Sequence, residues 1–554
     1  MKKRFAISFA LSAIGTAGFA AAKSSLKKVF ADETKKRSFL DKSDSIVQKV
    51  IGVLADRVSD AGIPYLNRYD DTGFLEGSGY FLAEPAKNAR WRLGFAKQSI
   101  IPAVVNGKLY VGGYLAFPPN TVSGYITDQL IRAAAFDDGS GRGINVFAVI
   151  DCIGISNTDI RHIRTLLKDF IAENNIVSLN ISATHCHSGV DTQGIWGSLT
   201  EALRVNGKAV ADGHPEDAVS GKNKDFMEYL FVTAADTVKK AVADMRPGKL
   251  EYTLADASEY VRDKRPPYIV DDKMTVMRFT PDDGEKSTVA VFLAAHPTCY
   301  GGRQREVSAD FPYYLCDETE RNGFNAMFFQ GAEAAVATER GGKHIPEGLS
   351  RHGGIEAYGR TLGQLALGSI NENMTEIEPM LNVAVTQAFV PSDNKILELA
   401  AKLRLVNNGI TKVCMDNEQD SKNYDLYLAT EVGYAEFGKT LKFALIPGEL
   451  CPELLVGGAY EKDKAYWGAD WKYPPMRSAV EGHLTVIGLC NDTIGYIVPD
   501  NDFGSVFAKD HYEEAVSTGR RAASNIVGAF LRTVEKAEKT RISGSQIIPE
   551  NSKG

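Results

Sequence analysis

Residues 177–189 read VSLNISATHCHSG, an apolar, β-branched half followed by a polar half. Two asparagines precede the stretch and Ser-Gly ends it, so the pattern predicts a buried strand that leads into a loop. Because alternate residues of an extended chain share a face, His185 and His187 should project to the same side at the strand's end. Two imidazoles at this spacing can bind one metal ion or serve one substrate, although two surface or core histidines would give the same isolated pattern.

The composition is that of an ordinary globular protein. The chain has 554 residues, of which 44% are apolar and 24% are charged, and its formal net charge is −7 at pH 7. This length suffices for one large domain or for several smaller ones. The mildly acidic balance gives no support for a nucleic-acid partner.

The N-terminus has the composition of an export signal. Residues 1–4 (MKKR) are basic, and residues 5–22 carry no charge. The segments 20–22 (AAA) and 29–31 (VFA) offer cleavage sites, so residues 1–31 are predicted to be a signal peptide or an N-terminal membrane anchor. Either would place the body of the protein outside the cytoplasm, secreted or anchored to the membrane. A buried N-terminal helix of a cytosolic protein is the alternative.

The seven cysteines are scattered and include no Cys-x-x-Cys pair. Neither a disulfide framework nor a cysteine zinc site is therefore indicated. Small buried thiols account for them best.

Strand-like and helix-like patterns interleave along most of the chain. Strands are expected at 92–96, 143–152, 177–183, 274–279, 287–295, 380–389, 426–434, 440–446 and 483–489, and helices at 45–61, 158–172, 222–245, 310–321, 354–370 and 506–536. No linker interrupts them, which predicts one large α/β domain with central β-sheets flanked by helices. We place this catalytic domain at 46–540, after a polar spacer at 32–45 and before a polar tail at 541–554.

Three more predicted strands end in residues that could share a site with the histidine pair. They run into His296, into Glu449 after a Pro-Gly turn, and into the segment that leads to Tyr496. Polar groups at the ends of buried strands are where α/β folds place their sites. Two histidines with one carboxylate are a common ligand set for catalytic zinc, which keeps a position open for water. Each strand end alone would also fit a buried histidine or a turn carboxylate.

Four segments resemble the neutral, or non-lysosomal, ceramidases and follow one another in that family's order. Residues 181–189, ISATHCHSG, resemble its I-S-A-T-H-T-H-S-G segment, and residues 294–300, AAHPTCY, its strand ending in His-Pro-Thr. Residues 446–453, IPGELCPE, are similar to its Pro-Gly-Glu segment, and residues 487–499, IGLCNDTIGYIVP, to its Gly-Leu-x-Asn-Asp-x-x-Gly-Tyr segment. The likeness extends over about residues 90–535, the family's catalytic domain only.

The resemblance implies roles for individual residues. Zinc would be held by His185, His296, Glu449 and Tyr496, with His187 beside it as an acid/base or substrate-binding group. An arginine before the strand at 274–279 would stabilise the oxyanion, with Arg262 as the first choice and Arg265 as its rival. Residues 510–513, DHYE, resemble part of the family's closing stretch, which implies that Tyr512 lines the site.

The chain departs from the family at one place. Where the family has Gly-Asp-x-Ser-Pro, residues 331–335 read GAEAA, without the aspartate, the serine or the proline. A serine nucleophile is therefore excluded. A mechanism through zinc-activated water needs only the metal, a proton donor and an oxyanion donor.

These observations predict an extracytoplasmic zinc-dependent amidohydrolase. It would cleave an N-acyl amide of a ceramide-like lipid into a free fatty acid and an amine, by zinc-activated water. Its partners would be this lipid-like substrate and, through the N-terminal segment or peripherally, a membrane. The alternatives are a zinc hydrolase of another acyl amide or ester, and a non-catalytic relative that binds a lipid or a surface ligand.

Overall fold

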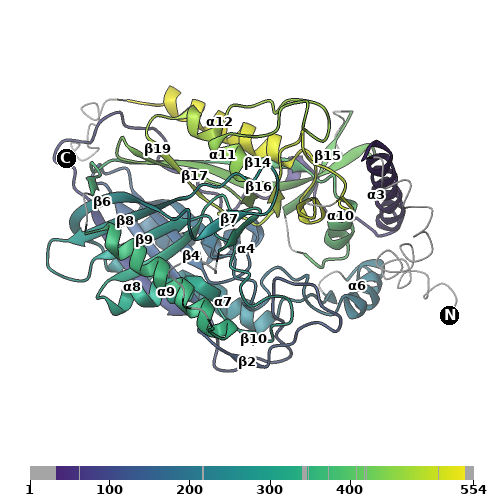
Figure 1. Cartoon of the computed structure of the whole chain (residues 1–554), viewed down its shortest axis with the longest axis horizontal. Helices are drawn as coiled ribbons and strands as arrows, with labels where there is room; N and C mark the ends of the chain where they lie inside the picture. Colours follow the sequence, from purple (N-terminus) through teal and green to yellow (C-terminus); the bar gives the residue numbers. More distant parts are fainter. Residues whose placement is uncertain are drawn as a thin grey trace.

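Two β-sheets are stacked face to face at the centre of the protein, and helices cover the outer face of each sheet (Figure 1). The structure is a computed structural model, which describes residues 33–542 apart from 61–62, 215–216, 340–345, 347, 372–373, 407–408, 417, 419–420 and 509–510. The α/β class with layered sheets, predicted from the sequence, is confirmed.

The larger sheet has nine strands. Their order is β11 (Asn325–Gln330), β9 (Thr288–Leu293), β8 (Lys273–Pro281), β6 (Arg246–Asp256), β1 (Arg92–Ser99), β3 (Leu130–Asp137), β4 (Ile144–Ile150) and β5 (Ile176–Ala183), with β13 (Thr375–Glu376) beside β6. The pairs are antiparallel except at the two ends, where β11 joins β9 and β4 joins β5 in parallel. Parallel neighbours need a crossover connection, which is helical here: α4 (Asn157–Leu166) and α5 (Lys168–Glu173) precede β5, and α8 (Asp310–Arg321) precedes β11.

The smaller sheet has five strands and packs against the larger one through aromatic side chains. It consists of β14 (Leu381–Pro391), β16 (Tyr424–Phe437), β17 (Leu441–Leu445) and β19 (His483–Ile487), with β15 (Gly409–Cys414) beside β16. The ring centroids of Phe292 and Phe443 lie 4.8 Å apart across the interface, and those of Phe136 and Phe437 lie 5.2 Å apart. Because alternate strand residues face opposite sides, both faces of the smaller sheet can carry apolar residues.

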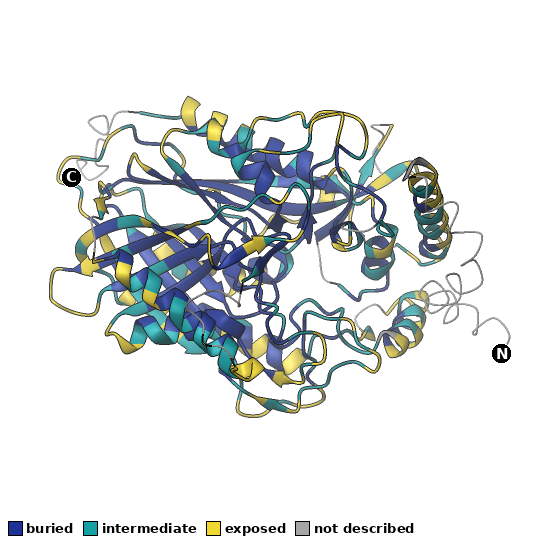
Figure 2. Cartoon of the chain, in the orientation of Figure 1, coloured by how far each residue is buried: buried dark blue, intermediate teal, exposed yellow. Residues whose placement is uncertain are grey.

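Helices bury the outer faces of both sheets (Figure 2). α12 (Ala522–Lys539) covers the smaller sheet, while α4 with α7 (Lys224–Ala243), and α8 with α9 (Arg351–Ser369), cover the two halves of the larger one. Of the remaining helices, α3 (Glu33–Ala55), α6 (Leu199–Asp212) and α10 (Lys395–Lys402) lie nearer the periphery, with α3 against α10, whereas the short α11 (Pro452–Val456) is buried in the core under α12.

The larger sheet curves until its two ends meet. β11 at one end lies close to β4 and β5 at the other. Gln330, the last residue of β11, is fully buried, and its side-chain amide donates hydrogen bonds to the carbonyl of Thr184 at 3.0 Å and to that of Ala295 at 2.8 Å. These two carbonyls immediately precede His185 and His296. One amide thus sets the distance between the two strand ends that carry these histidines.

Two segments differ from the sequence-based expectation. Residues 33–45, expected as a spacer, belong to α3, which begins at Glu33. Its polar composition reflects one exposed face, while Leu40 is buried and the Arg37 guanidinium lies 3.9 Å from the ring centroid of Tyr466. Residues 506–508 and 511–521 are mostly irregular rather than helical, with one short helical turn, η4 (Glu513–Val516), because buried ion pairs from Arg265 to Glu513 and Glu514 hold this stretch in place. The predicted signal or anchor at 1–31 and residues 543–554 of the predicted tail lie outside the described residues.

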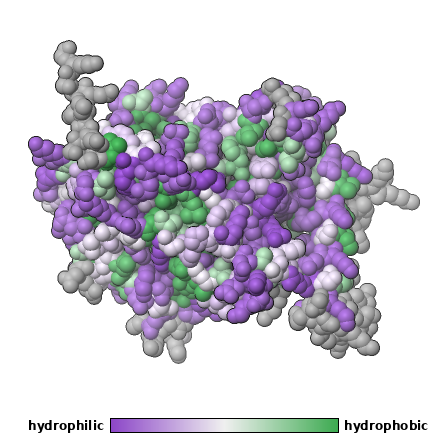
Figure 3. All heavy atoms as spheres, turned by 90° about the horizontal axis from the view of Figure 1, so that it is seen from above, coloured by the Kyte–Doolittle hydropathy of each residue, from purple (hydrophilic) through white to green (hydrophobic). Residues whose placement is uncertain are grey.

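The face shown in Figure 3 is mostly hydrophilic, with small, separate apolar patches. Within the part of the chain that the structure describes, no helix combines the length and the hydropathy needed to cross a membrane.

We predict that Gln330→Leu destabilises the protein by about 2–5 kcal/mol, because it leaves two buried carbonyl groups without their donors. Urea unfolding of wild type and variant measures the difference. The control is Gln364→Leu, which changes an exposed glutamine of α9 and should alter the free energy of unfolding by less than about 0.5 kcal/mol. Equal stability of the two variants would contradict the role of Gln330 in joining the strand ends.

Candidate metal centre and cavity

A cavity of about 580 Å³ lies at the ends of strands from both sheets. Six residues singled out from the sequence contribute to its wall: His185, His187, His296, Glu449, Tyr496 and Tyr512. They come from five separate segments of the chain, so the structure brings together the strand ends that the sequence analysis selected and the later segment that carries Tyr512.

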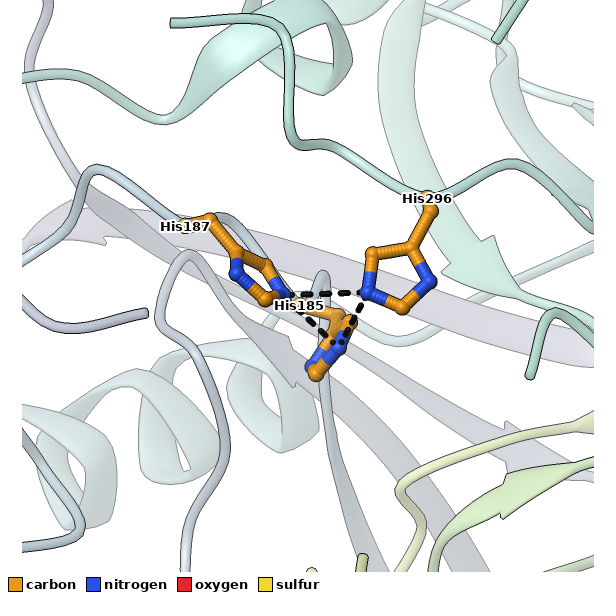
Figure 4. Close-up of side chains that lie close together, drawn as sticks. All are labelled: His185, His187 and His296. Atoms are coloured by element: carbon orange, nitrogen blue, oxygen red, sulfur yellow. Dashed lines mark hydrogen bonds between the residues drawn. The ribbon is translucent and has the colours of Figure 1, made fainter. Parts of the chain in front are cut away.

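The three histidines point their Nε2 atoms at one another (Figure 4). His185 follows β5, His187 lies two residues further on, and His296 follows β9. Each of the three Nε2–Nε2 distances is 3.0 Å. Nitrogen ligands about 2.0–2.1 Å from one zinc ion lie roughly 3.3 Å apart in a tetrahedral arrangement, so the observed triangle is close to the size that an ion requires.

The other ring nitrogen of each histidine faces a backbone carbonyl. Nδ1 lies 2.7 Å from the Ile153 oxygen for His185, 3.0 Å from the Gly113 oxygen for His187, and 3.4 Å from the Glu333 oxygen for His296. A carbonyl can only accept, so the proton is assigned to Nδ1 and each Nε2 keeps a lone pair directed at the centre of the triangle. Three converging lone pairs repel one another unless a cation lies between them.

Burial keeps the rings of His187 and His296 neutral. Burial, followed by the proximity of His185, holds the pKa of both His187 and His296 well below the usual histidine value. The ammonium group of Lys264 acts in the same direction on both rings. Neutral imidazole is the form that binds metals.

The Glu449 carboxylate completes the group. Its Oε2 atom lies 3.3 Å from His185 Nε2 and 3.7 Å from His296 Nε2. This oxygen is buried and has no hydrogen-bond partner among the described residues. Three imidazole nitrogens and one carboxylate oxygen that lacks a donor are a ligand set that suits zinc.

Tyr496 is held beside Glu449 by the backbone. The short strands β18 (Glu449–Leu450) and β20 (Tyr496–Ile497) pair in parallel, with Glu449 opposite Tyr496. The Tyr496 ring is nearly parallel to the His296 ring, with centroids 6.3 Å apart. Burial, and then the charge of Glu449, raise the pKa of Tyr496 well above its usual value.

Two local features of the backbone position the histidines. His185 has a positive φ of 64°, which is costly for a residue other than glycine and which clusters at functional sites. Gly113 passes so close to His187 that a Cβ atom there would stand 2.6 Å from the His187 Cα. Only glycine therefore lets the Gly113 carbonyl reach the His187 ring.

His187 differs from the role that the resemblance implies. It was expected beside the zinc as an acid/base or substrate-binding group, yet its Nε2 is equivalent in geometry to those of His185 and His296. Strand alternation does not explain this, because β5 ends at Ala183 and His185 has a positive φ; the loop after the strand brings the two rings together.

Neither arginine expected to stabilise the oxyanion lines the cavity. The Arg262 side chain is 62% exposed and pairs with Glu339 at 2.9 Å. Arg265 is buried and binds the carboxylates of Asp502, Glu513 and Glu514, which fixes the segment that carries Tyr512. Both expectations are corrected: Arg262 lies on the surface, and Arg265 supports the neighbouring loop.

Lys264 lies in the cavity wall between these two arginines in sequence, and the sequence analysis missed it. The basic run 262–265 was the available signal, but the resemblance directed attention to arginine alone. Tyr512, half exposed, lies at the same cavity, with its ring centroid 5.9 Å from that of Tyr496.

The remainder of the cavity is largely apolar. One limb is formed by α10, β15, β16 and adjoining loops, and its side chains include Leu397, Val406, Ile410, Leu428 and Val516. The cavity therefore combines a polar end, where the histidines converge, with a limb suited to a hydrocarbon chain.

We predict that the stability of the metal-free protein falls as the pH decreases below about 6.5. Below this pH the unfolded chain takes up protons at His187 and His296, while the folded protein does not. The free energy of unfolding therefore falls by up to about 1.4 kcal/mol for each histidine and each pH unit. Urea unfolding after chelation, at pH 7.5 and at 5.5, measures the slope. The double variant His187→Gln/His296→Gln should show a smaller slope, and an unchanged one would refute the assignment.

The fold is similar to that of solved ceramidases. The structure of neutral ceramidase from Pseudomonas aeruginosa matches with a TM-score of 0.58 at 15% sequence identity, covering 84% of this chain and 77% of that one. A ceramidase complexed with C2 gives the same TM-score and identity, with 84% and 78% covered. Compared by sequence alone, the chain matches no protein-family model and no curated protein. The expectation drawn from the sequence segments is thus confirmed for the fold: the chain has a neutral ceramidase-like fold.

Proposed function

We propose that the chain is a zinc-dependent amidohydrolase that cleaves the N-acyl amide bond of a ceramide-like lipid. The observation that carries the proposal is the triangle of three Nε2 atoms 3.0 Å apart, with the Glu449 Oε2 beside it, at the end of a largely apolar cavity. The likeness of the fold to neutral ceramidases supports the same class of reaction.

The residues of the chain divide the task between them. His185, His187, His296 and Glu449 would hold the metal, with Tyr496 adjacent. Zinc at this position supplies a Lewis acid and lowers the pKa of water to about 7. The apolar limb binds a hydrocarbon chain and excludes water, which orients the amide group at the polar end.

Lys264 and Tyr512 supply the remaining polar chemistry. The Lys264 ammonium can stabilise the amide oxygen as negative charge develops on it. Burial, together with the charge of Glu513, raises the pKa of Tyr512 above its usual value, so its hydroxyl keeps its proton at neutral pH and can donate it to the leaving nitrogen. His187 does not have this role in the proposal, because both of its nitrogens are already engaged.

Hydrolysis of another acyl amide or of an ester is the second candidate. It is favoured by Ala332 and Ala334, which stand where the resembling family has aspartate and serine. Purified protein assayed with N-acyl sphingoid bases, simple N-acyl amides and acyl esters distinguishes the two candidates. A zinc-loaded protein inert towards all of them would instead indicate a non-catalytic binder.

We predict that zinc copurifies at about one ion per chain, and that His185→Ala and Glu449→Ala remove most of it and lower hydrolysis at least about 100-fold. His187→Gln should also weaken zinc binding, because its Nε2 belongs to the triangle. Elemental analysis and release of free fatty acid from an N-acyl sphingoid base are the measurements. His162→Ala and His352→Ala change histidines outside the triangle and should keep both metal and activity; equal metal loss in all five variants would sink the proposal.

We also propose that the protein works outside the cytoplasm. The support is the basic start at 1–4 and the uncharged run at 5–22, which lie outside the described residues. Protease added to intact cells should therefore digest the protein while a cytosolic marker survives. Protection of both until the cells are lysed would contradict this localisation.

A further inference from the structure

Glu333 is a buried carboxylate for which neither the sequence motifs nor the proposed mechanism provides a role. It follows β11 and has no exposed surface. Both of its carboxylate oxygens lack a hydrogen-bond partner among the described residues. Glu333 occupies the variable position of the pattern Gly-Asp-x-Ser-Pro, so the family resemblance assigns nothing to it.

The Glu333 carboxylate lies next to the histidine triangle. One ligand atom each from Glu333, Glu449 and His185 lie within 4.8 Å of one another. Two ligands on opposite sides of one ion, each about 2.1 Å away, are about 4.2 Å apart. A small movement of the Glu333 side chain would therefore place the ligand atoms of Glu333, Glu449 and His185 around a common ion.

Glu333 approaches this position from the protein interior. It is not part of the cavity wall, whereas Glu449 and the three histidines are. Its Oε2 atom lies against Gly488, where an added Cβ would stand 3.0 Å from it and 2.6 Å from the Gly331 carbonyl oxygen. The backbone carbonyl of Glu333 also accepts from His296 Nδ1. One residue therefore orients a histidine of the triangle and directs a carboxylate towards it.

The burial of this carboxylate needs a partner. If the group is ionised, its charge is uncompensated in the interior, which is strongly unfavourable. If it is protonated, its hydroxyl has no acceptor among the described residues. A divalent cation satisfies both carboxylates at once, and two carboxylates balance its charge.

We propose that Glu333 is a ligand of the metal, so that three histidines and two glutamates form the donor set. The inference rests on the proposed function in one respect, namely that the triangle holds a metal ion. Glu333 closes the side of the ion that faces the protein, and the cavity side stays open for substrate. Five protein donors give a coordination number above four, which distinguishes this centre from a tetrahedral zinc site.

Cobalt(II) titration of the full chain after chelation tests the proposal without an activity assay. Cobalt(II) absorbs visible light strongly in tetrahedral sites and weakly when five- or six-coordinate. The wild type should bind one cobalt ion with weak absorption. Glu333→Gln, which keeps the shape but removes the charge, should bind it at least about 10-fold more weakly and with stronger absorption. Glu453→Gln changes a buried glutamate of α11 away from the triangle and should behave as the wild type.

The outcomes separate the two proposals. If the wild type binds no cobalt or zinc, the metal centre itself is refuted, and the role of Glu333 with it. If the wild type binds and Glu333→Gln shows the same affinity and absorption, only the role of Glu333 is refuted. If Glu333→Gln does not fold, Glu333→Asp replaces it, because aspartate keeps the charge on a shorter side chain. Cobalt binding by Glu333→Asp with the affinity and absorption of the wild type would overturn the proposal. A change in the affinity or in the absorption supports it.

Discussion

The site exists because the two ends of a nine-stranded sheet meet. In a flat sheet, β9 and β5 would be separated by six strand spacings of about 4.8 Å, or roughly 29 Å, yet the histidines that follow these strands have Nε2 atoms 3.0 Å apart. The buried amide of Gln330 holds the backbone just before both histidines. The smaller sheet then adds Glu449 and Tyr496 through the paired strands β18 and β20. Every other feature of the site depends on this closure.

The closure concentrates electron pairs in a region from which water is largely excluded. The three imidazole Nε2 atoms point at one another, the Glu449 and Glu333 carboxylates lie beside His185, and the cationic Lys264 of the cavity wall is exposed. Such an arrangement is expected to be stable only with a bound cation, because buried polar atoms without partners are costly. The backbone carbonyls that accept each Nδ1 proton also favour a bound cation, because they prevent the rings from turning their protonated nitrogens inward.

The sequence was sufficient to predict what depends on local pattern and insufficient for what depends on distant neighbours. Hydrophobic periodicity located the strands that carry His185, His296 and Glu449, and α8 was predicted with its observed bounds. The roles of Arg262 and Arg265 were misassigned because exposure is decided by the partners Glu339 and Glu514, both more than 70 residues away in sequence. The sequence analysis did not select Glu333, because a single glutamate among alanines matches no motif. The start of α3 was placed too late because a polar face hides one buried contact at Leu40.

The two ends of the cavity contribute unequally to substrate selection. An apolar limb gains about 0.8 kcal/mol for each buried methylene, so it favours long hydrocarbon chains without distinguishing sharply between chains of similar length. Discrimination between an amide and an ester, or between head groups, must come from the few polar atoms near the histidines, where an unmatched hydrogen-bonding group costs far more. Ala332 and Ala334, which depart from the resembling family, flank Glu333, whose carboxylate lies within 4.8 Å of ligand atoms of His185 and Glu449 at this polar end. Under the proposed function, these replacements change the surroundings of the scissile bond, so any difference in specificity from the ceramidases should concern the chemistry of that bond rather than the length of the lipid.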